Sequence, residues 1–222
     1  MDWIESTIKF DSKRSFRLIH FDCVECPIVP GSVIEGSRDE LSKCEDLLGS
    51  VLWLDAVSLL LPYLSGELLA GPSVSTALCL GEGTGAVGCG INTLRVCRNI
   101  LITDLPDLLP ILRRNAALAG DSVTALSLDW TCRVPAHLVG RCDLIIGCEV
   151  VYGNRFVWEG LLNTIRTSMN PNRCTVYICV TLRNKRHDLE DFRDNYLSQL
   201  FGKISEISLS DSVSVLKAST TS

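Results

Sequence analysis

The sequence lacks an uninterrupted apolar run of about 20 residues, which is the length that a helix needs to cross a bilayer. Its longest candidate, residues 51–69, is interrupted by Asp55, Pro62, Ser65, Gly66 and Glu67. The first residues also lack the basic start and apolar stretch of a secretory signal. We therefore expect a protein without membrane contact, located in the cytoplasm and able to occur in the nucleus.

The sequence has no excess of basic residues. It contains 21 Lys and Arg against 26 Asp and Glu, for a net charge of -5. Because a nucleic-acid binder commonly carries a basic face, this balance makes nucleic acid an unexpected partner. The 222 residues are 46% hydrophobic, which is enough for one sizeable core with a small appendage.

The 11 cysteines do not include the set of closely spaced ligands that a zinc site requires. Cys23-x-x-Cys26 has half of a zinc spacing, but no second pair completes it. Several others, including Cys79, Cys148 and Cys179, lie inside apolar runs, as buried thiols do in a reducing compartment. We expect no metal site and no catalytic cysteine.

Expected helices and expected strands alternate from residue 47 onward. Helices are expected at 47–69, 85–96, 106–119, 156–169 and 187–200, and strands at 74–80, 99–103, 123–128, 143–148 and 175–181. Two last strands, 203–209 and 213–218, are too close in sequence for a parallel crossover and must pair antiparallel. The pattern predicts an α/β fold of three layers, with a mostly parallel sheet and a C-terminal antiparallel hairpin.

The N-terminal part differs from this pattern. Residues 1–13 are polar and mixed, and we expect a frayed terminus there. Residues 16–21 and 28–29 are β-prone and separated by a break at Pro27, which predicts a β-hairpin. We therefore divide the chain into an N-terminal extension, residues 1–46, and one domain, residues 47–222.

A glycine loop follows the first strand of the alternating region. Gly81-Glu82-Gly83-Thr84-Gly85 allows a sharp turn and a close ligand approach, and the next helix presents free N–H groups. A dinucleotide fingerprint is satisfied by Gly81, Gly83, Ala86 and the later acid Asp104. An S-adenosylmethionine loop, Gly-x-Gly-x-Gly, is satisfied by Gly81, Gly83 and Gly85. With either cofactor, Asp104 would accept hydrogen bonds from the ribose hydroxyls. The loop alone leaves both cofactors open.

A series of motifs, taken in order, resembles one family. They are Gly49-Ser50-Val51-Leu52-Trp53, Leu78-Cys79-Leu80 with the glycine loop, Thr103-Asp104-Leu105-Pro106 with the later Asn115, Leu128-Asp129-Trp130, and Glu149-Val150-Val151-Tyr152. The chain resembles the seven-stranded, Rossmann-like S-adenosylmethionine-dependent protein methyltransferases of the family-16 type, which methylate lysine. The resemblance covers roughly residues 49–218, and it implies a protein substrate. We expect the chain to be a monomer.

The resemblance also implies roles for individual residues. The implied cofactor-binding residues are Trp53, Gly81, Glu82, Gly83, Thr84, Gly85, Asp104, Leu105, Asp129, Trp130 and Cys148, and the implied catalytic residues are Glu149 and Tyr152. In this assignment Asp104 binds the ribose, and Asp129 and Trp130 border the adenine. Glu149 and Tyr152 line the channel for the methyl acceptor and orient its amine. Each assignment has a structural alternative, namely a core or edge tryptophan, a turn aspartate or an exposed strand end.

Two residues depart from the family pattern. Cys79 stands where the family has an acid in the first strand, and Glu149 replaces the usual aspartate. Glu82 lies in the loop, but we expect its side chain to point elsewhere and not to replace the missing acid. A binding module without catalytic activity is therefore an alternative. A nucleic-acid methyltransferase is another, although the Asn/Asp-Pro-Pro-Tyr motif of such enzymes is missing after the fourth strand. The third is an NAD-dependent oxidoreductase.

Overall fold

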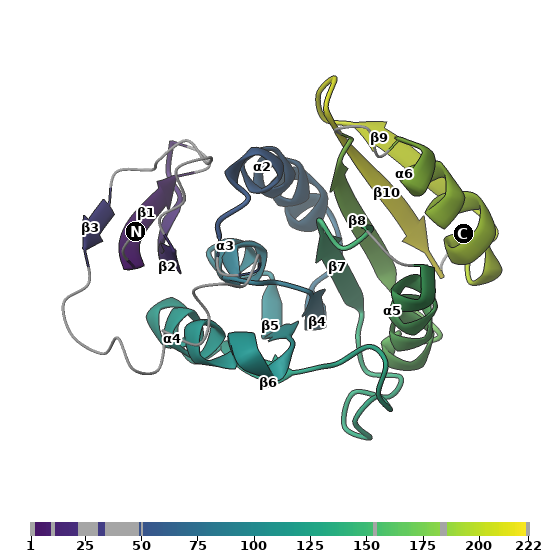
Figure 1. The fold of residues 1–222 in the computed structure, drawn as a ribbon, viewed down its shortest axis with the longest axis horizontal. Coiled ribbons are helices and arrows are strands. Elements are labelled where there is room, and N and C mark those ends of the chain that lie inside the picture. The colour runs from purple at the N-terminus through teal and green to yellow at the C-terminus, as the bar shows by residue number, and fades with distance from the viewer. Residues whose placement is uncertain are drawn as a thin grey trace.

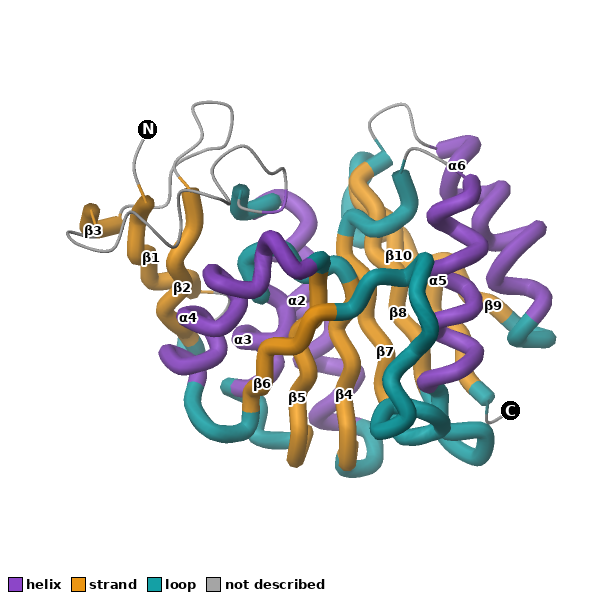
Figure 2. The backbone as a smooth tube through the Cα atoms, turned by 60° about the horizontal axis from the view of Figure 1, so that its bottom comes forward, coloured by secondary structure: helices purple, strands orange, loops and turns teal. Residues whose placement is uncertain are grey.

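Two β-sheets organise the chain, as the ribbon and tube views show (Figures 1 and 2). The structure is a computed structural model that describes residues 3–9, 12–21, 31–33, 49, 51–152, 155–182 and 186–220. A three-stranded sheet has the order β2-β1-β3, and a seven-stranded sheet has the order β6-β5-β4-β7-β8-β10-β9.

The seven-stranded sheet confirms the predicted architecture. Its strands are β4 Val74–Leu80, β5 Cys97–Asp104, β6 Val123–Ser127, β7 Leu144–Cys148, β8 Thr175–Thr181, β9 Ile204–Ser208 and β10 Val213–Ser219. Strands β4 to β8 run parallel, and β10 is antiparallel to both of its neighbours, β8 and β9. The strand order reverses between β4 and β7, and ligands bind at such a point in open α/β sheets.

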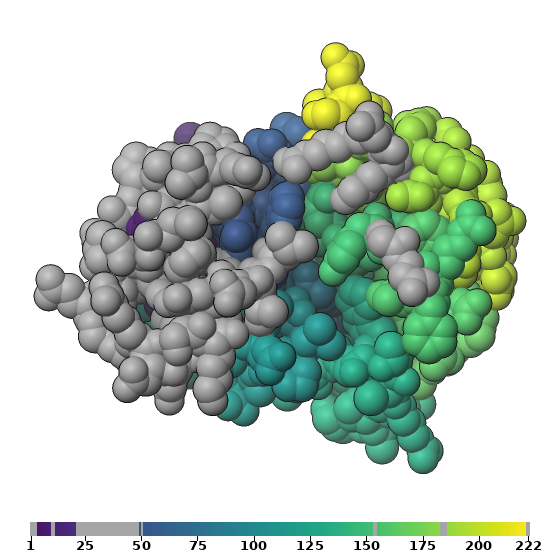
Figure 3. Space-filling model, viewed as in Figure 1, coloured from purple at the N-terminus to yellow at the C-terminus, as the bar shows by residue number. Residues whose placement is uncertain are grey.

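Helices cover both faces of this sheet. One face packs against α2 Leu54–Ala70, α3 Ala86–Asn92 and α4 Leu109–Ala119, which follows the short η3 Pro106–Leu108; the other packs against α5 Arg155–Ser168 and α6 Arg186–Asp191. Alternate strand residues face opposite layers: Cys79 packs with the first group, and Leu78 and Leu80 pack with the second. In space-filling form the blue residues of α2 adjoin the green and yellow C-terminal half (Figure 3).

The last helical segment differs from the continuous helix expected at 187–200. After α6 the backbone widens into the π-helix η4 Phe192–Tyr196 and ends in the 3-10 helix η5 Leu197–Gln199. The rings of Phe192 and Tyr196 stack at 5.9 Å, and both meet Trp158 of α5 edge-on. Helical periodicity contains no information about this three-ring contact, which comes from packing between distant segments.

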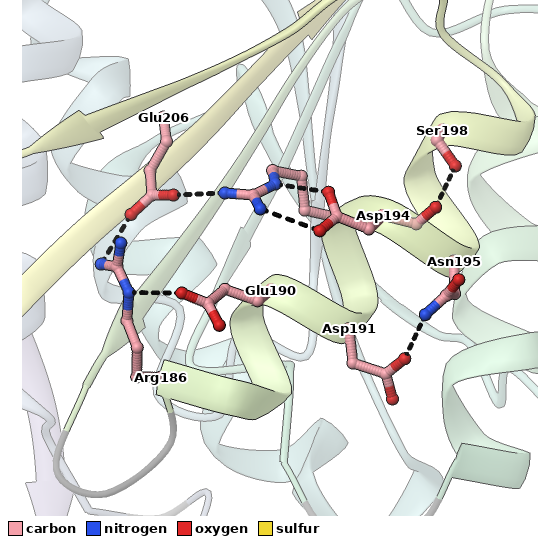
Figure 4. A network of polar contacts seen from close by, with 8 residues as sticks. Arg186, Glu190, Asp191, Asp194, Asn195, Ser198 and Glu206 are labelled. Atoms are coloured by element: carbon pink, nitrogen blue, oxygen red, sulfur yellow. Dashed lines mark hydrogen bonds and ion pairs between the residues drawn. The ribbon is translucent and has the colours of Figure 1, made fainter.

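Ion pairs tie the same segment to the edge strand β9 (Figure 4). Arg193 bonds Glu206 at 2.8 Å and Asp194 at 2.7 Å, while Arg186 bonds Glu206 at 2.8 Å and Glu190 at 3.0 Å. Arg186 therefore belongs to a half-exposed polar network.

The N-terminal hairpin is shifted from its predicted place. Strand β1 Trp3–Lys9 pairs antiparallel with β2 Ser15–Phe21, and β3 Gly31–Val33 pairs with β1. Residues 3–9 are therefore a strand and not a frayed end, whereas residues 28–29 and Cys23-x-x-Cys26 lie outside the described residues. The polar residues of β1 concealed its period of two, in which Ile4, Ser6 and Ile8 are buried.

Candidate functional site

A cavity of about 680 Å³ opens at the carboxyl ends of β4, β5 and β7, where the strand order reverses. This volume is in the range of small-molecule and cofactor sites. All the residues that the sequence assigns to the site line the cavity except Gly85; those that line it are Trp53, Gly81, Glu82, Gly83, Thr84, Asp104, Leu105, Asp129, Trp130, Cys148, Glu149 and Tyr152.

The glycine loop turns so closely against its neighbours that a Cβ atom at its glycines would clash with them. Gly81, Gly83 and Gly85 have positive φ angles of 60°, 56° and 81°. A Cβ atom at Gly83 would lie 2.3 Å from the carbonyl oxygen of Gly49, and one at Gly81 would lie 3.1 Å from the ring of Trp130. Gly85 faces inward instead, where its Cβ would meet Ile102 at 2.9 Å. Gly85 therefore shapes the turn into α3 without lining the cavity.

Asp104 is bound to the glycine loop. Its Oδ2 accepts a hydrogen bond from the Gly83 N–H at 2.7 Å, and its Oδ1 accepts one from the Leu105 N–H at 2.7 Å. Burial raises the pKa of this carboxyl, against the lowering effect of the two bonds. The side chain thus holds the end of β5 against the loop while it faces the cavity, and Leu105 beside it is half exposed at the rim.

Asp129 and Trp130 form the wall after β6. The Oδ1 atom of Asp129 accepts hydrogen bonds from the N–H and hydroxyl of Thr131, and these bonds lower the pKa of its carboxyl. The Trp130 backbone and Cβ pack so closely against Gly160 that a Cβ there would lie 2.7 Å from the Trp130 oxygen. The indole Nε1 of Trp130 is buried and has no hydrogen-bond partner among the described residues. Such an unpaired buried donor is rare in a folded protein.

Glu149 has a backbone that its residue type rarely adopts. It follows β7 with a φ of 60°, and its N–H donates to the carbonyl oxygen of Cys179 at 2.9 Å. Its Oε1 accepts a short hydrogen bond from the Thr181 N–H of β8. A non-glycine residue in this region costs about 1–3 kcal/mol, and such strain concentrates at functional sites. The hydrogen bond from Thr181 holds the carboxyl in place on the cavity wall in spite of this strain.

Tyr152 lies at the mouth of the cavity with 52% of its surface exposed. The indole N–H of Trp158 donates to its carbonyl oxygen at 3.2 Å, which fixes the backbone before α5. Burial, followed by the charge of Asp104, raises the pKa of the phenol, so the hydroxyl stays protonated at neutral pH. The mouth therefore combines a fixed carboxylate with a neutral phenol.

Cys148 and Trp53 line the cavity in different ways. The thiol of Cys148 is next to that of Cys179, and their hydrogen bond, with burial, raises the Cys148 pKa well above its usual value. It is a neutral wall residue and not an activated nucleophile. Trp53 immediately precedes α2, and its carbonyl oxygen accepts the N–H of Val57 at 3.2 Å.

The carboxyl of Glu82 lies against the first turn of α3. Its Oε2 accepts a hydrogen bond from the Gly88 N–H at 3.0 Å, and its Oε1 is buried without a hydrogen-bond partner among the described residues. Burial raises the pKa of this carboxyl to about 8. The side chain turns under the loop because three left-handed glycines reverse the chain around it, which an extended strand-turn frame does not anticipate.

Twelve further residues of the cavity were given no role from the sequence. Gly49, Val51, Leu52, Ala86, Leu128 and Val150 occur in the quoted motifs without an assigned contact. The others, which are mostly apolar, have no sequence signal that separates them from core residues: Val57, Val87, Asp107, Leu108, Thr131 and Val157. Among the described residues no cluster of three or more His, Cys, Asp or Glu side chains has the arrangement of a metal site. None of the helices in the described ranges is both long and apolar enough to cross a membrane.

A protein-family model described as lysine methyltransferase matches residues 40–199 of the chain. No curated protein matches the chain. This match favours S-adenosylmethionine over a dinucleotide as the ligand of the glycine loop.

Many solved structures share the fold. A ribosomal protein L11 methylase from Lactobacillus delbrueckii subsp. bulgaricus has 18% identity and a TM-score of 0.54, over 73% of this chain and 77% of that one. A protein of Nostoc punctiforme assigned as an O-methyltransferase has 13% identity and a TM-score of 0.55, over 75% and 60%. The branched-chain polyamine synthase of Thermus thermophilus, solved with 5'-methylthioadenosine, has 12% identity and a TM-score of 0.54, over 74% and 54%. The chain thus spans less than two thirds of the last two proteins.

Proposed function

We propose that this chain, which belongs to the lysine methyltransferase family, transfers a methyl group from S-adenosylmethionine to a lysine side chain of another protein. The methyltransferase fold and the cofactor follow from the family and the sheet. The lysine acceptor and the protein substrate are the proposal. One observation carries it: Glu149 and Tyr152 place a fixed carboxylate and a neutral phenol beside a cofactor-sized cavity.

The residues of the cavity fit the cofactor. Asp129 and Trp130 line the cavity after β6, and Glu82 and Cys148 line it at the ends of β4 and β7. The Trp130 indole N–H and the Glu82 Oε1 are buried polar atoms that lack partners among the described residues. We assign Asp104 to the ribose hydroxyls, because its carboxylate is already held at the cavity wall by Gly83 and Leu105.

The mouth of the cavity is suited to an amine acceptor. The bound cofactor supplies an electrophilic methyl group on a sulfonium. A lysine amine has an unperturbed pKa near 10.4, so it must lose a proton before its nitrogen can attack. Glu149 and Tyr152 orient the nitrogen by hydrogen bonds, and the apolar lining favours its neutral form. Positioning contributes much of the rate in such a displacement.

The first test is calorimetric titration of the purified protein with S-adenosylhomocysteine and, separately, with NAD. We expect S-adenosylhomocysteine to bind and NAD not to bind. The glycine loop has the Gly-x-Gly-x-Gly spacing of an S-adenosylmethionine site, and the family uses S-adenosylmethionine. Binding of NAD alone would contradict the assignment of the cavity. Binding of neither would favour a module that retains the fold without the activity.

The second test is transfer of a radiolabelled methyl group into cell lysate. Wild-type protein should label a protein band at lysine, while Glu149→Ala and Asp104→Ala should not. Asp121→Ala is the control, because Asp121 is an exposed turn residue that does not line the cavity. Label found only in RNA would overturn the protein substrate, and label on a different side chain would overturn lysine.

A further inference from the structure

The carboxyl of Glu82 is held on one side only. Its Oε2 accepts the Gly88 N–H at 3.0 Å, in the first turn of α3, and the neighbouring Val87 N–H also acts on the carboxyl. Its Oε1 is buried, and no described residue donates to it. Glu82 is one of the residues that line the cavity, so this buried oxygen without a described partner belongs to the cavity wall.

The groups packed around Glu82 do not neutralise a negative charge. They are the thiols of Cys79 on β4, Cys89 on α3 and Cys148 on β7, and the carboxyl of Asp104 on β5. Each thiol has a raised pKa and stays neutral, and Asp104 is an acid of the same sign. A buried carboxylate among such neighbours is unfavourable unless a cation joins it.

We propose that Glu82 is the counter-ion for the cationic amino-acid end of the cofactor, and that cofactor binding expels a proton from its carboxyl. This inference rests on the proposed function, since it assumes that S-adenosylmethionine occupies the cavity. The adenosine part is neutral, so the ammonium of the amino-acid part is the group of the product S-adenosylhomocysteine that can complement Glu82. The family has an acid at the position of Cys79, but this cysteine is fully buried and stays neutral. In this chain, therefore, the acid for the cofactor comes from the glycine loop, as Glu82.

Because the Glu82 carboxyl is buried, its protonation state should change when the ligand binds. Its pKa of about 8 in the free protein makes it mostly protonated at pH 7. A cationic group beside Oε1 favours the ionised form and lowers that pKa. Binding of a ligand with an ammonium should then release close to one proton at pH 7. The affinity should rise with pH up to about 8 and level off above it, where Glu82 is already ionised.

The experiment compares two ligands that share adenosine. S-adenosylhomocysteine carries the ammonium, and 5'-methylthioadenosine lacks the whole amino-acid part. Calorimetry at pH 7 in two buffers with different ionisation enthalpies measures the protons released on binding. Wild-type protein should release close to one proton with the first ligand and almost none with the second. This comparison needs no variant, so it stands even if a substitution prevents folding.

Glu82→Gln adds a second readout, because glutamine is isosteric and can still accept the Gly88 N–H. It should bind S-adenosylhomocysteine at least tenfold more weakly without proton release, and 5'-methylthioadenosine as wild type does. Asp121→Asn, in an exposed turn, is the control and should match wild type. Equal weakening for both ligands would mean that Glu82 only supports the loop, and it would overturn the inference. Wild-type binding without proton release would also overturn it, while leaving the proposed function intact. If wild-type protein binds neither ligand, the proposed function fails as well.

Discussion

At the scale of single residues, the site depends on side chains held by the backbone of a neighbouring strand or loop. Glu149 of the β7 end is bound by the Thr181 N–H of β8, and Asp104 of the β5 end by the Gly83 N–H of the loop. Each carboxylate therefore has a fixed position before any ligand binds. Such preorganisation lowers the entropy that must be lost when the reacting groups meet.

Glu149→Gln tests whether the charge or the shape at this position matters. The amide oxygen of glutamine can accept the Thr181 N–H, so the side chain should keep its place. We expect a decrease of about 100-fold in the rate of methyl transfer, in the range typical of positioned acid–base groups, with unchanged S-adenosylhomocysteine binding. Glu149→Asp keeps the charge on a shorter chain and should retain more activity. Equal activity of the two variants in a labelled-transfer assay would show that the charge is not needed.

The backbone at Glu149 gives a prediction about stability. Because its φ is 60°, glycine should tolerate this position better than alanine, by about 1 kcal/mol in the free energy of unfolding. Urea denaturation of Glu149→Gly and Glu149→Ala measures this difference, since both variants lack the carboxylate. The same pair at Arg98, an exposed residue of β5 without a positive φ, should show the opposite order. An alanine variant as stable as the glycine variant at 149 would mean that the strain is absent.

The sequence predicted the identities of many cavity residues but not the directions of their side chains. Motif order was sufficient to place Trp53, Asp104 and Trp130 at the same cavity. The inward turn of Glu82 depends on three successive left-handed glycines, and the bond from Thr181 to Glu149 depends on strand register. Both are relations between residues brought together only by the folded chain.

At the scale of elements, the N-terminal hairpin is connected to the cofactor loop through one buried side chain of α4. The amide of Asn115 donates to the carbonyl oxygens of Ile19 and Thr84 at 2.8 and 2.7 Å, and it accepts the Ile19 N–H at 2.7 Å. Asn115 thus pairs with β2 as a neighbouring strand would, and it holds the carbonyl of Thr84 in the glycine loop. The hairpin also contributes Ile8, Phe16 and Leu18 to the core beside α2, α3 and α4.

Asn115→Ala should therefore destabilise the protein more than an ordinary helix substitution. It leaves three buried backbone groups without their partner, and we expect a loss of about 3 kcal/mol in the free energy of unfolding. Hydrogen exchange should show faster exchange of the Ile19 amide, and calorimetry should show weaker S-adenosylhomocysteine binding.

The matched control is Asn92→Ala in α3. Asn92 is similarly buried but donates one hydrogen bond of the described set, to the Ala119 carbonyl oxygen at 2.9 Å. Asn92→Ala should lower the free energy of unfolding by about 1 kcal/mol. It should not change hydrogen exchange at the Ile19 amide. If the two variants lose equal stability and Ile19 remains protected in both, the hairpin is held by its apolar contacts alone.

Elements with strong periodicity were predicted within a few residues, and those shaped by distant contacts were not. Strand β8, residues Thr175–Thr181, was predicted with its observed bounds because its apolar run is bordered by turn residues. Strand β1 was missed because its buried face contains Ser6, whose hydroxyl bonds His20 of β2 at 2.9 Å. A polar residue on the buried face removes the signal of alternation that a strand prediction requires.

At the scale of the whole molecule, the buried carboxyl of Glu82 links the stability of the free protein to pH. Its pKa is about 8 in the folded protein, against an ordinary value of 4.5. The folded state therefore binds more protons than the unfolded state between these values, and the free energy of unfolding falls as pH rises through this window. Below about pH 4 and above about pH 8, Glu82 contributes no slope.

Glu82→Gln should remove this dependence, because glutamine does not titrate. Between pH 5 and pH 8 the wild-type protein should lose about 4 kcal/mol more stability than the variant, as judged by urea denaturation without ligand. Asp104 also has a raised pKa, but it is present in both proteins, so the difference between them isolates Glu82. Saturating S-adenosylhomocysteine should reduce the wild-type slope, because the ligand supplies the cation that the ionised carboxyl lacks. Parallel curves for the two proteins would show that Glu82 is ionised in the folded state, and its charge would then need a partner other than the cofactor.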